Sequence, residues 1–436
     1  MTDSTPNADP EGPAAKGRPG KPRLFSMLGP GLITGAADDD PSGIATYSQA
    51  GARFGYDLGW TLLFSLPLMC AIQEISARIG RVTGRGVAGN LKRHYPDGVV
   101  YGLVALLVMA NTINLGADLG AMGAALKLVV GGPALLYVAG FGVLSIVLEV
   151  FVRYTRYVSV LKWLTLSLFA YVGAAIVVHM PWGKATYSLV APNISLAPGY
   201  LTVVVAILGT TISPYLFFWQ AEEEVEEVKE RDDARPLERD PSRAPAEFSR
   251  IRWDTYIGMS FSALIATFIL WTSAATLHAH GIAIHTSADA AKALGPIAGP
   301  FASVIFALGI VGTGLLAVPV LAGSAAYALG EAFGWHVGLA REAHRAKAFY
   351  GAIATAMVAG GALNFVHINP IKALFWSAVI NGVASVPIMI LIMHLASHKA
   401  AMGQFKLHIG LKAMGWLAVA VMAAAAVGMF ATLGRG

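Results

Sequence analysis

The chain has 436 residues, of which 56% are hydrophobic and 13% are charged, with a formal net charge of +5. A soluble domain carries roughly 25% charged residues, and the mean hydropathy here is +0.60, so the composition excludes a soluble globular protein and predicts a polytopic membrane protein. No basic run is interleaved with aromatic residues, so basic cytosolic loops explain the positive charge better than nucleic-acid binding does.

The N-terminal stretch differs from the rest of the chain. Residues 1–24 are polar and rich in Pro, Gly and Ala, and they lack the apolar core of a signal peptide, which predicts a disordered cytosolic tail. We expect residues 25–436 to form a single transmembrane domain. The one cysteine, Cys70, lies in an apolar run and has no intrachain disulfide partner.

Apolar windows of about 20 residues, the length needed to cross a bilayer, predict about eleven transmembrane helices. They fall near 29–54, 57–79, 98–130, 132–153, 156–180, 199–221, 254–279, 299–333, 348–366, 370–396 and 411–433. Lys and Arg concentrate in alternate connections, which predicts a cytosolic N-terminus and an extracellular C-terminus. The densely charged connection 222–252 predicts a cytosolic extension of the sixth helix that passes into a flexible linker.

A polar run from Asp38 to Gly43 interrupts the first helix. One carboxylate at the bilayer centre costs at least roughly 2.5 kcal/mol, so three in succession need water, a cation or a protein-lined cavity. Pro41 has no N–H to donate and Gly43 has no side chain to cover the backbone. We therefore expect the helix to unwind here and expose carbonyl groups.

The sixth helix contains a second interruption, from Gly209 to Tyr215 with Pro214 inside it. The two interrupted helices are five helices apart, which predicts two five-helix halves of opposite topology. The first repeat spans about 29–180, the second about 199–396, and an extra helix follows at about 411–433. In such an inverted repeat the two breaks meet near the midplane and line a site for a small solute.

Several runs are similar to those of a known family. Asp40 to Thr46, followed by Gln49-Ala50-Gly51-Ala52, resembles the first helix of Nramp divalent-metal transporters, which has Asp-Pro-Gly-Asn and a Gln-Ala-Gly-Ala continuation. Residues 208–215 lie where that family has Gly-Ala-Thr-Val-Met-Pro-His, and 76–84 and 312–331 also fit. The resemblance implies an all-α membrane protein with a LeuT-type 5+5 inverted repeat, multi-pass in the cell membrane, that is not an enzyme, needs no cofactor and does not require oligomerisation.

The departures from the family pattern bear on the substrate. Carried over by position, the metal-binding Asp is Asp40, while the family's Asn is replaced by Gly43, its Met by Ser213, its Ala by Thr210 and its His by Tyr215. Without the soft thioether, oxygen ligands remain, and these suit a hard, partly hydrated ion. The pattern is most similar to the Nramp-related magnesium transporter branch and implies Mg²⁺ as the favoured substrate, with Mn²⁺ as a second ion.

We expect the metal site to draw on residues of both breaks, namely Asp40, Ser213, Thr210, Gly43, Asp39 and Thr211. Other polar residues are expected to line the pathway, namely Asp38, Tyr215, Gln220, Asp118 and Asn381. The hydroxyls could instead satisfy carbonyls freed at the kink, and Asp38 and Asp39, which inherit no role, could be hydrated. The carboxylates of 222–227 are interpreted as a solvated helix end, with an exit funnel or regulatory cation site as the alternative.

The predicted function is a secondary transporter or facilitator of divalent cations that works by alternating access, with the metal ion and the lipid bilayer as its partners. The resemblance implies that proton-coupled Nramp members use acidic residues of the third helix and a His in the sixth. No His follows Pro214 here, so we expect no proton coupling. One alternative is a proton-coupled Mn²⁺/Fe²⁺ importer of the usual Nramp type. Another is a sodium-coupled organic-solute carrier, which the three aspartates disfavour. An intramembrane aspartyl hydrolase is least favoured, because its aspartates would have to face one another from different helices.

Overall fold

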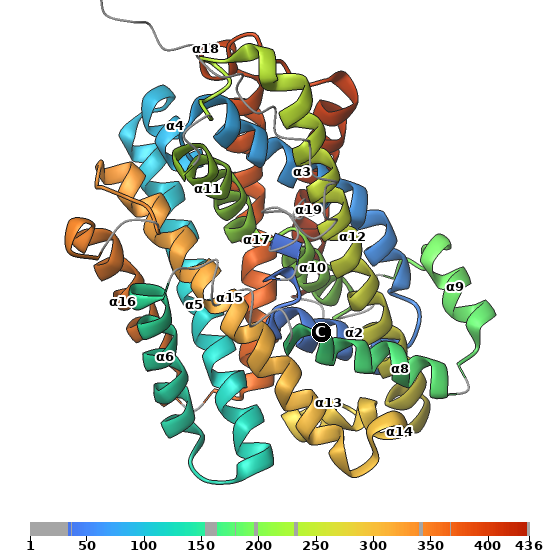
Figure 1. The fold of residues 1–436 in the computed structure, drawn as a ribbon. Coiled ribbons are helices and arrows are strands. Elements are labelled where there is room, and N and C mark those ends of the chain that lie inside the picture. Colours follow the sequence, from blue (N-terminus) through green and yellow to red (C-terminus); the bar gives the residue numbers. More distant parts are fainter. Residues whose placement is uncertain are drawn as a thin grey trace, which may run out of the picture.

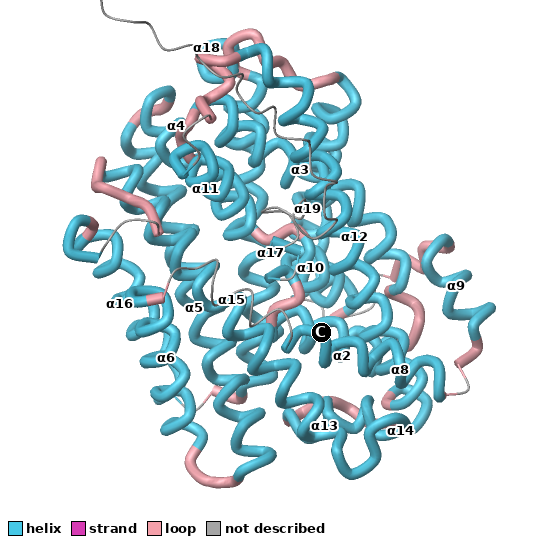
Figure 2. The backbone as a smooth tube through the Cα atoms, in the orientation of Figure 1, coloured by secondary structure: helices cyan, strands magenta, loops and turns pink. Residues whose placement is uncertain are grey.

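The structure is a computed structural model that describes residues 34–35, 37–152, 164–178, 180–195, 199–230, 234–339, 343–366 and 368–433. The predicted tail, 1–24, lies outside the described residues. The described residues form helices joined by loops and contain no strand (Figures 1 and 2). The predicted all-α fold is therefore confirmed.

The α-helices run through the whole described chain. Their bounds are α2 Pro41–Phe54, α3 Gly59–Thr83, α4 Val87–His94, α5 Asp97–Val130, α6 Ala134–Phe151, α8 Phe169–Val177, α9 Trp182–Val190, α10 Tyr200–Thr211, α11 Pro214–Glu230, α12 Ala244–Thr276, α13 Ser287–Ala291, α14 Gly295–Ala298, α15 Ala302–Phe333, α16 Lys347–Ala362, α17 Pro370–Ser397, α18 Lys399–Met402 and α19 Ile409–Leu433. Short 3-10 turns extend several of them, including η2 (Leu164–Leu168) before α8 and η8 (Leu363–Val366) after α16.

Within the described residues, nine helices are long and apolar enough to cross a membrane. The broken first helix and a shorter apolar helix, Leu166–Val177, accompany them. This set agrees with the prediction of about eleven transmembrane helices. The sequence windows did not predict α4, α9, α13, α14 and α18, since these helices are too short to give a spanning signal.

Both predicted interruptions are breaks in a helix. Thr34, Gly35, Ala37 and Asp38 are helical, Asp39 and Asp40 are not, and α2 begins at Pro41. Likewise α10 ends at Thr211 and α11 begins at Pro214. Proline suits the first position of a helix, because the missing N–H has no intrahelical partner there. Each proline therefore starts the second half of its helix.

The broken helices lie inside the bundle. α2 packs against α12, α17 and α10, and α11 packs against α3 and α15 (Figure 1). α5 and α15 pack along one another, and every α10 residue from Thr202 to Thr211 is buried. The two breaks are therefore enclosed by the other helices, and loop segments interrupt the helices in the middle of the molecule (Figure 2).

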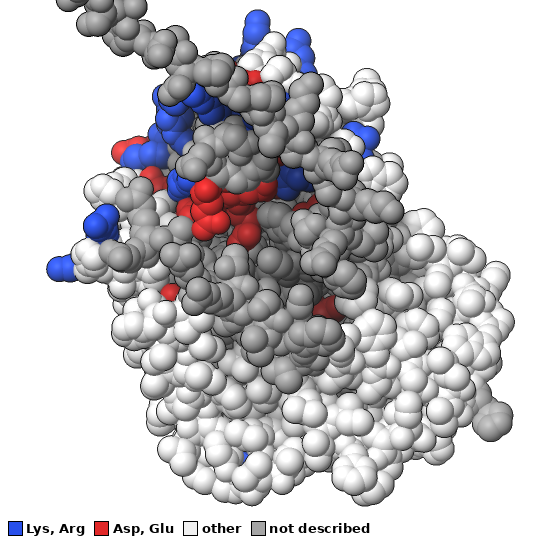
Figure 3. All heavy atoms as spheres, viewed as in Figure 1, with Lys and Arg blue, Asp and Glu red and all other residues white. Residues whose placement is uncertain are grey.

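Positive charge gathers at one end of the molecule. Figure 3 shows Lys and Arg concentrated over the end that carries α4 and α18, whereas the end near α13 and α14 is almost uncharged on this face. We call the first the basic end; its residues include Arg85, Lys92, Arg93 and Lys399. The concentration agrees with the alternation of basic connections along the sequence.

Some charges that the sequence placed in connections are buried instead. Arg78 and Arg81 lie in the last turns of α3 and are 6% and 1% exposed, because Arg78 pairs with Glu74 and Arg81 with Glu247. The segment after α11 also differs from the expected flexible linker, since the Leu237 N–H donates to the Arg81 carbonyl at 3.1 Å. α12 begins at Ala244, about ten residues before the apolar window near 254. The window missed these first turns because they are polar, and they are held by ion pairs with α3 and α11.

Close packing of α5 and α16 gives a first testable prediction. A Cβ added at Gly360 would lie 2.6 Å from Leu115 Cδ2 and 2.9 Å from the Thr112 carbonyl oxygen, whereas one at Gly361 would meet only Leu119 Cδ1 at 3.9 Å. We expect Gly360→Ala to destabilise the protein by roughly 1–3 kcal/mol. Gly361→Ala is the matched control, because both variants gain the same helix propensity. Equal thermal unfolding of the two variants in one detergent would contradict this packing.

Candidate metal site at the two helix breaks

Asp40 occupies the break of the first helix and caps the start of α2. One of its carboxylate oxygens, Oδ1, accepts the Gly43 N–H and the Ser42 hydroxyl, both at 2.7 Å. The other, Oδ2, accepts the Asn114 amide at 3.0 Å and lies 3.5 Å from the Tyr215 hydroxyl. Asp40 is 2% exposed. Donors from α2, α5 and α11 thus fix the position of this carboxylate.

Asp38 and Asp39 point toward α12. The Ser262 hydroxyl lies 2.6 Å from Asp38 Oδ2 and 3.1 Å from Asp39 Oδ1. Both aspartates are 1% exposed, and Asp38 Oδ1 accepts no hydrogen bond from any described residue. Ser262 could not be predicted from the sequence, because a contact across 224 residues leaves no local pattern. These two carboxylates therefore extend the polar site from the break toward α12.

The hydroxyls of the second break are held by their own helix. Thr211 donates to the Ile207 carbonyl at 3.0 Å, and Ser213 lies 2.7 Å from the Gly209 and Thr210 carbonyls. Each hydroxyl has one proton and two lone pairs. With the proton directed to the backbone, the lone pairs of these oxygens stay available to a cation.

Hydrogen bonds join the two broken helices on both sides of the breaks. The Thr210 hydroxyl donates to the Tyr47 hydroxyl at 2.9 Å, and the Tyr215 hydroxyl donates to the Ala37 carbonyl at 3.2 Å. Thr34 donates to Gln220 Oε1 at 2.6 Å. The sequence predicted roles for Thr210, Tyr215 and Gln220, but it missed Tyr47, which lies on the same face of α2 as Gly43, one turn away.

The remaining predicted residues lie on α5 and α17. Asp118 is 0% exposed, lies one turn beyond Asn114 and is close enough to Asp40 for their charges to interact. Asn381 is 1% exposed, and within the described residues neither polar atom of its side-chain amide makes a hydrogen bond. Its neighbour Gly382 packs against Gly209 beside the second break. The Asn114 contact with Asp40 was not identified from the sequence, because it joins residues 74 positions apart on different helices.

The charge at the breaks is negative, and no basic side chain of the described residues balances it. None of the ion pairs among the described residues includes Asp38, Asp39, Asp40 or Asp118. Within the same residues, no three His, Cys, Asp or Glu side chains converge closely enough to hold a metal ion. Buried carboxylates are costly unless a cation, a proton or hydrogen bonds compensate them. The arrangement thus favours a cation that also takes hydroxyl, carbonyl or water oxygens.

A cavity of about 670 Å³ opens at the end opposite the basic end. It lies between the last turns of α2, the start of α10 and the start of α17, and its lining residues include Gln49, Arg53, Thr202, His285, Lys372 and Trp376. Gln49 is 9% exposed, whereas Thr46, one turn closer to the break, is 0% exposed. The cavity therefore ends before it reaches Asp40.

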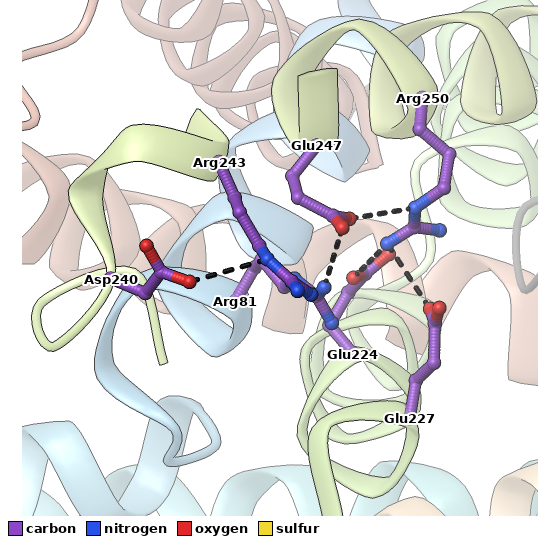
Figure 4. A network of polar contacts seen from close by, with 7 residues as sticks. All are labelled: Arg81, Glu224, Glu227, Asp240, Arg243, Glu247 and Arg250. Carbon is purple, nitrogen blue, oxygen red and sulfur yellow. Dashed lines mark hydrogen bonds and ion pairs between the residues drawn. The ribbon is translucent and has the colours of Figure 1, made fainter. Parts of the chain in front are cut away.

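Ion pairs join three helices at the basic end (Figure 4). Arg250 of α12 contacts Glu224 at 2.5 Å and Glu227 at 3.1 Å, both on α11, and its own neighbour Glu247 at 3.0 Å. Glu247 also contacts Arg81 of α3 at 2.8 Å. The half of the sixth helix that begins at the break is thus fastened to α12 and, through Glu247, to α3.

With the breaks and their partners defined, the chain can be compared with known proteins. The family described as "Natural resistance-associated macrophage protein-like" matches residues 31–432. The chain belongs to the Nramp family. The match covers both helix breaks and every element from α2 to α19, so the resemblance of the short runs extends to the whole bundle.

Other Nramp relatives are similar over most of the chain. It is 25% identical over 397 residues to the divalent metal cation transporter MntH of Acidiphilium cryptum, covering 89% of this chain and 86% of the relative. It is 26% identical over 303 residues to MntH of Burkholderia ambifaria, covering 68% and 66%.

Solved structures agree on the Nramp fold. The manganese transporter of Eremococcus coleocola matches with a TM-score of 0.72 at 18% identity, covering 95% of this chain and 89% of that one. MHP1, a nucleobase-cation-symport-1 family transporter, matches with a TM-score of 0.55 at 14% identity, covering 93% and 90%. The fold is the LeuT-type inverted repeat with unwound helices one and six, as predicted.

Proposed function

We propose that this Nramp chain carries divalent metal cations across a cell membrane by alternating access, with Mg²⁺ favoured and Mn²⁺ as a second substrate. The observation that carries the proposal is the set of four buried aspartates beside the two helix breaks, with no basic partner among the described residues. The relatives named as divalent metal cation and manganese transporters support the substrate class. In this view the basic end is cytosolic, as is the N-terminus.

Asp40 is the proposed direct ligand, with Thr210, Thr211, Ser213 and carbonyls exposed at the breaks as neutral oxygen donors. Mg²⁺ dehydrates reluctantly and is usually bound through one or two carboxylates while it keeps several waters. A site with one positioned carboxylate and several hydroxyls suits that ion. Asp38 and Asp39 add negative charge, which favours a divalent over a monovalent cation.

Transport without proton movement is the second part of the proposal. Tyr215 stands where the family's His would stand, and its hydroxyl is engaged with Ala37 and Asp40. Asp118, buried beside Asp40, is the observation that favours the alternative, a proton-coupled Mn²⁺/Fe²⁺ importer. The membrane potential supplies about 2.3 kcal/mol per elementary charge per 100 mV, so a divalent ion enters without a coupled proton.

Ser213→Met tests whether the softness of the ligand at this position sets the metal preference. A thioether at the second break favours softer metals, so we expect the ratio of Cd²⁺ to Mg²⁺ uptake into proteoliposomes to rise about tenfold, which corresponds to about 1.4 kcal/mol. Ser213→Leu is the matched control, because it adds similar bulk without sulfur. An unchanged ratio in Ser213→Met, or an equal rise in Ser213→Leu, would show that ligand softness does not set the preference.

A further inference from the structure

The start of α4 at the basic end is capped by a carboxylate from α15. Glu331 Oε1 accepts the Gly86 N–H and Oε2 accepts the Gly89 N–H, both at 2.7 Å. A helix N-terminus carries partial positive charge and favours the ionised form of a nearby carboxylate. Each oxygen uses one lone pair for its amide and keeps the other. Glu331 is thus held in place at the start of α4, with both carboxylate oxygens turned to the glycine amides.

A second carboxylate, from α11, meets this cap. Glu222 is 1% exposed, and neither of its carboxylate oxygens accepts a hydrogen bond from the part of the chain that the structure describes. It lies within hydrogen-bonding reach of Glu331. A Cβ on Gly86 would lie 1.7 Å from Glu222 Oε1 and 2.6 Å from Glu331 Oε2. The two carboxylates therefore converge on one glycine, and the sequence-based interpretation of Glu222 as part of a solvated helix end does not describe this residue.

The surrounding charges leave this pair negative. Lys229 and Glu226 are charged neighbours of Glu222, and they pair with one another at 3.0 Å. The Lys229 side chain is 41% exposed, so it stays largely in solvent. Tyr327 also faces the pair, and its hydroxyl accepts the Leu339 N–H. Glu222 is buried and Glu331 is partly buried, and two carboxylates that face one another in such a place need a shared proton or a cation.

We propose that Glu222 and Glu331 together bind one hard divalent cation, Mg²⁺ in the cell, at a site separate from Asp40. Two carboxylates completed by water are the ligand set that Mg²⁺ accepts. A third acidic or His ligand is not required, in keeping with the absence of three-residue clusters among the described residues. Glu222 lies nine residues after Ser213, about 13 Å further along the sixth helix at 1.5 Å per residue.

The consequence is a contact that depends on cytosolic metal. The ion joins α4, α11 and α15, and α11 is the half of the sixth helix that leads from the break to the basic end. Binding from the cytosol would therefore fasten α11 to α4 and α15 at the basic end.

The test uses Mn²⁺ as a paramagnetic probe on the purified full-length chain. In Asp40→Ala, electron paramagnetic resonance should detect one bound Mn²⁺ per chain that Mg²⁺ displaces, and Mg²⁺ should raise the melting temperature. Adding Glu222→Gln should weaken Mn²⁺ binding at least tenfold and abolish the Mg²⁺-dependent shift. Glu223→Gln in the same background is the matched control, from the next position on α11, and should retain both.

Several results would overturn the proposal. One is an Asp40→Ala protein that binds no Mn²⁺, the outcome expected if the two carboxylates share a proton. Another is binding that survives both Glu222→Gln and Glu331→Gln, or that Glu223→Gln removes equally. Because the site is measured without Asp40, failure of the transport proposal leaves this test intact, and loss of the second site leaves metal uptake through Asp40 to be measured separately.

Discussion

Asp40→Ala is expected to abolish Mg²⁺ and Mn²⁺ uptake in proteoliposomes. The substitution removes the carboxylate that receives donors from α2, α5 and α11. Removing one member of a buried, hydrogen-bonded charge interaction costs roughly 2–5 kcal/mol, and each 1.4 kcal/mol is about tenfold in affinity. We therefore expect the apparent affinity for Mg²⁺ and Mn²⁺ to fall by roughly 30-fold or more, which leaves no measurable uptake at concentrations that saturate the wild type.

A loss of uptake in Asp40→Ala could reflect either lost metal binding or lost stability, because Asp40 also caps α2. Loss of such a cap costs about 1 kcal/mol of stability. Asp40→Asn keeps the shape and a capping oxygen while removing the charge. The expected result is a melting temperature close to that of the wild type with uptake still lost. Wild-type uptake by Asp40→Asn would refute the role of this charge as the metal ligand.

Arg250→Ala is expected to destabilise the protein more than any exposed charge substitution. It leaves Glu224, whose side chain is 0% exposed, without its cation, and it also removes the contacts to Glu227 and Glu247. Removing one partner from a buried ion pair costs roughly 3–5 kcal/mol. Thermal unfolding followed by tryptophan fluorescence in one detergent measures the effect.

Two comparisons make the Arg250 result specific. Lys229→Ala breaks a pair whose lysine is 41% exposed, and such surface pairs contribute about 0–1 kcal/mol. The double variant Arg250→Met with Glu224→Gln removes both charges, so it should recover much of the lost stability. If Arg250→Ala and Lys229→Ala melt alike, the ion pairs of Figure 4 do not hold α11 to α12.

The parts of the fold that follow local rules could be predicted from the sequence. The spanning helices gave long apolar windows, and both breaks were marked by a proline inside an apolar segment, Pro41 and Pro214. The start of α12 was missed because Glu247 and Arg250 make its first turns polar. Their burial depends on partners in α3 and α11 that hydropathy does not reveal.

The site itself could be predicted only in part. Helix periodicity holds within a helix, but the direction of Asp38 and Asp39 depends on how far the chain turns at the break. That turn directs both side chains to Ser262 on α12. Glu222 and Glu331 lie together although they are more than a hundred residues apart in the sequence. Such contacts arise from the packing of whole helices, so no sequence motif predicts them.

The most direct measurement of the central claim is Mg²⁺ entry into proteoliposomes under an imposed inside-negative potential. A Mg²⁺-sensitive dye and a pH dye inside the vesicles are read together, with Asp40→Asn as the inactive control. We predict that Mg²⁺ enters faster as the potential becomes more negative while the internal pH stays constant. Absence of Mg²⁺ entry, or internal acidification in proportion to the metal that enters, would contradict an uncoupled Mg²⁺ carrier.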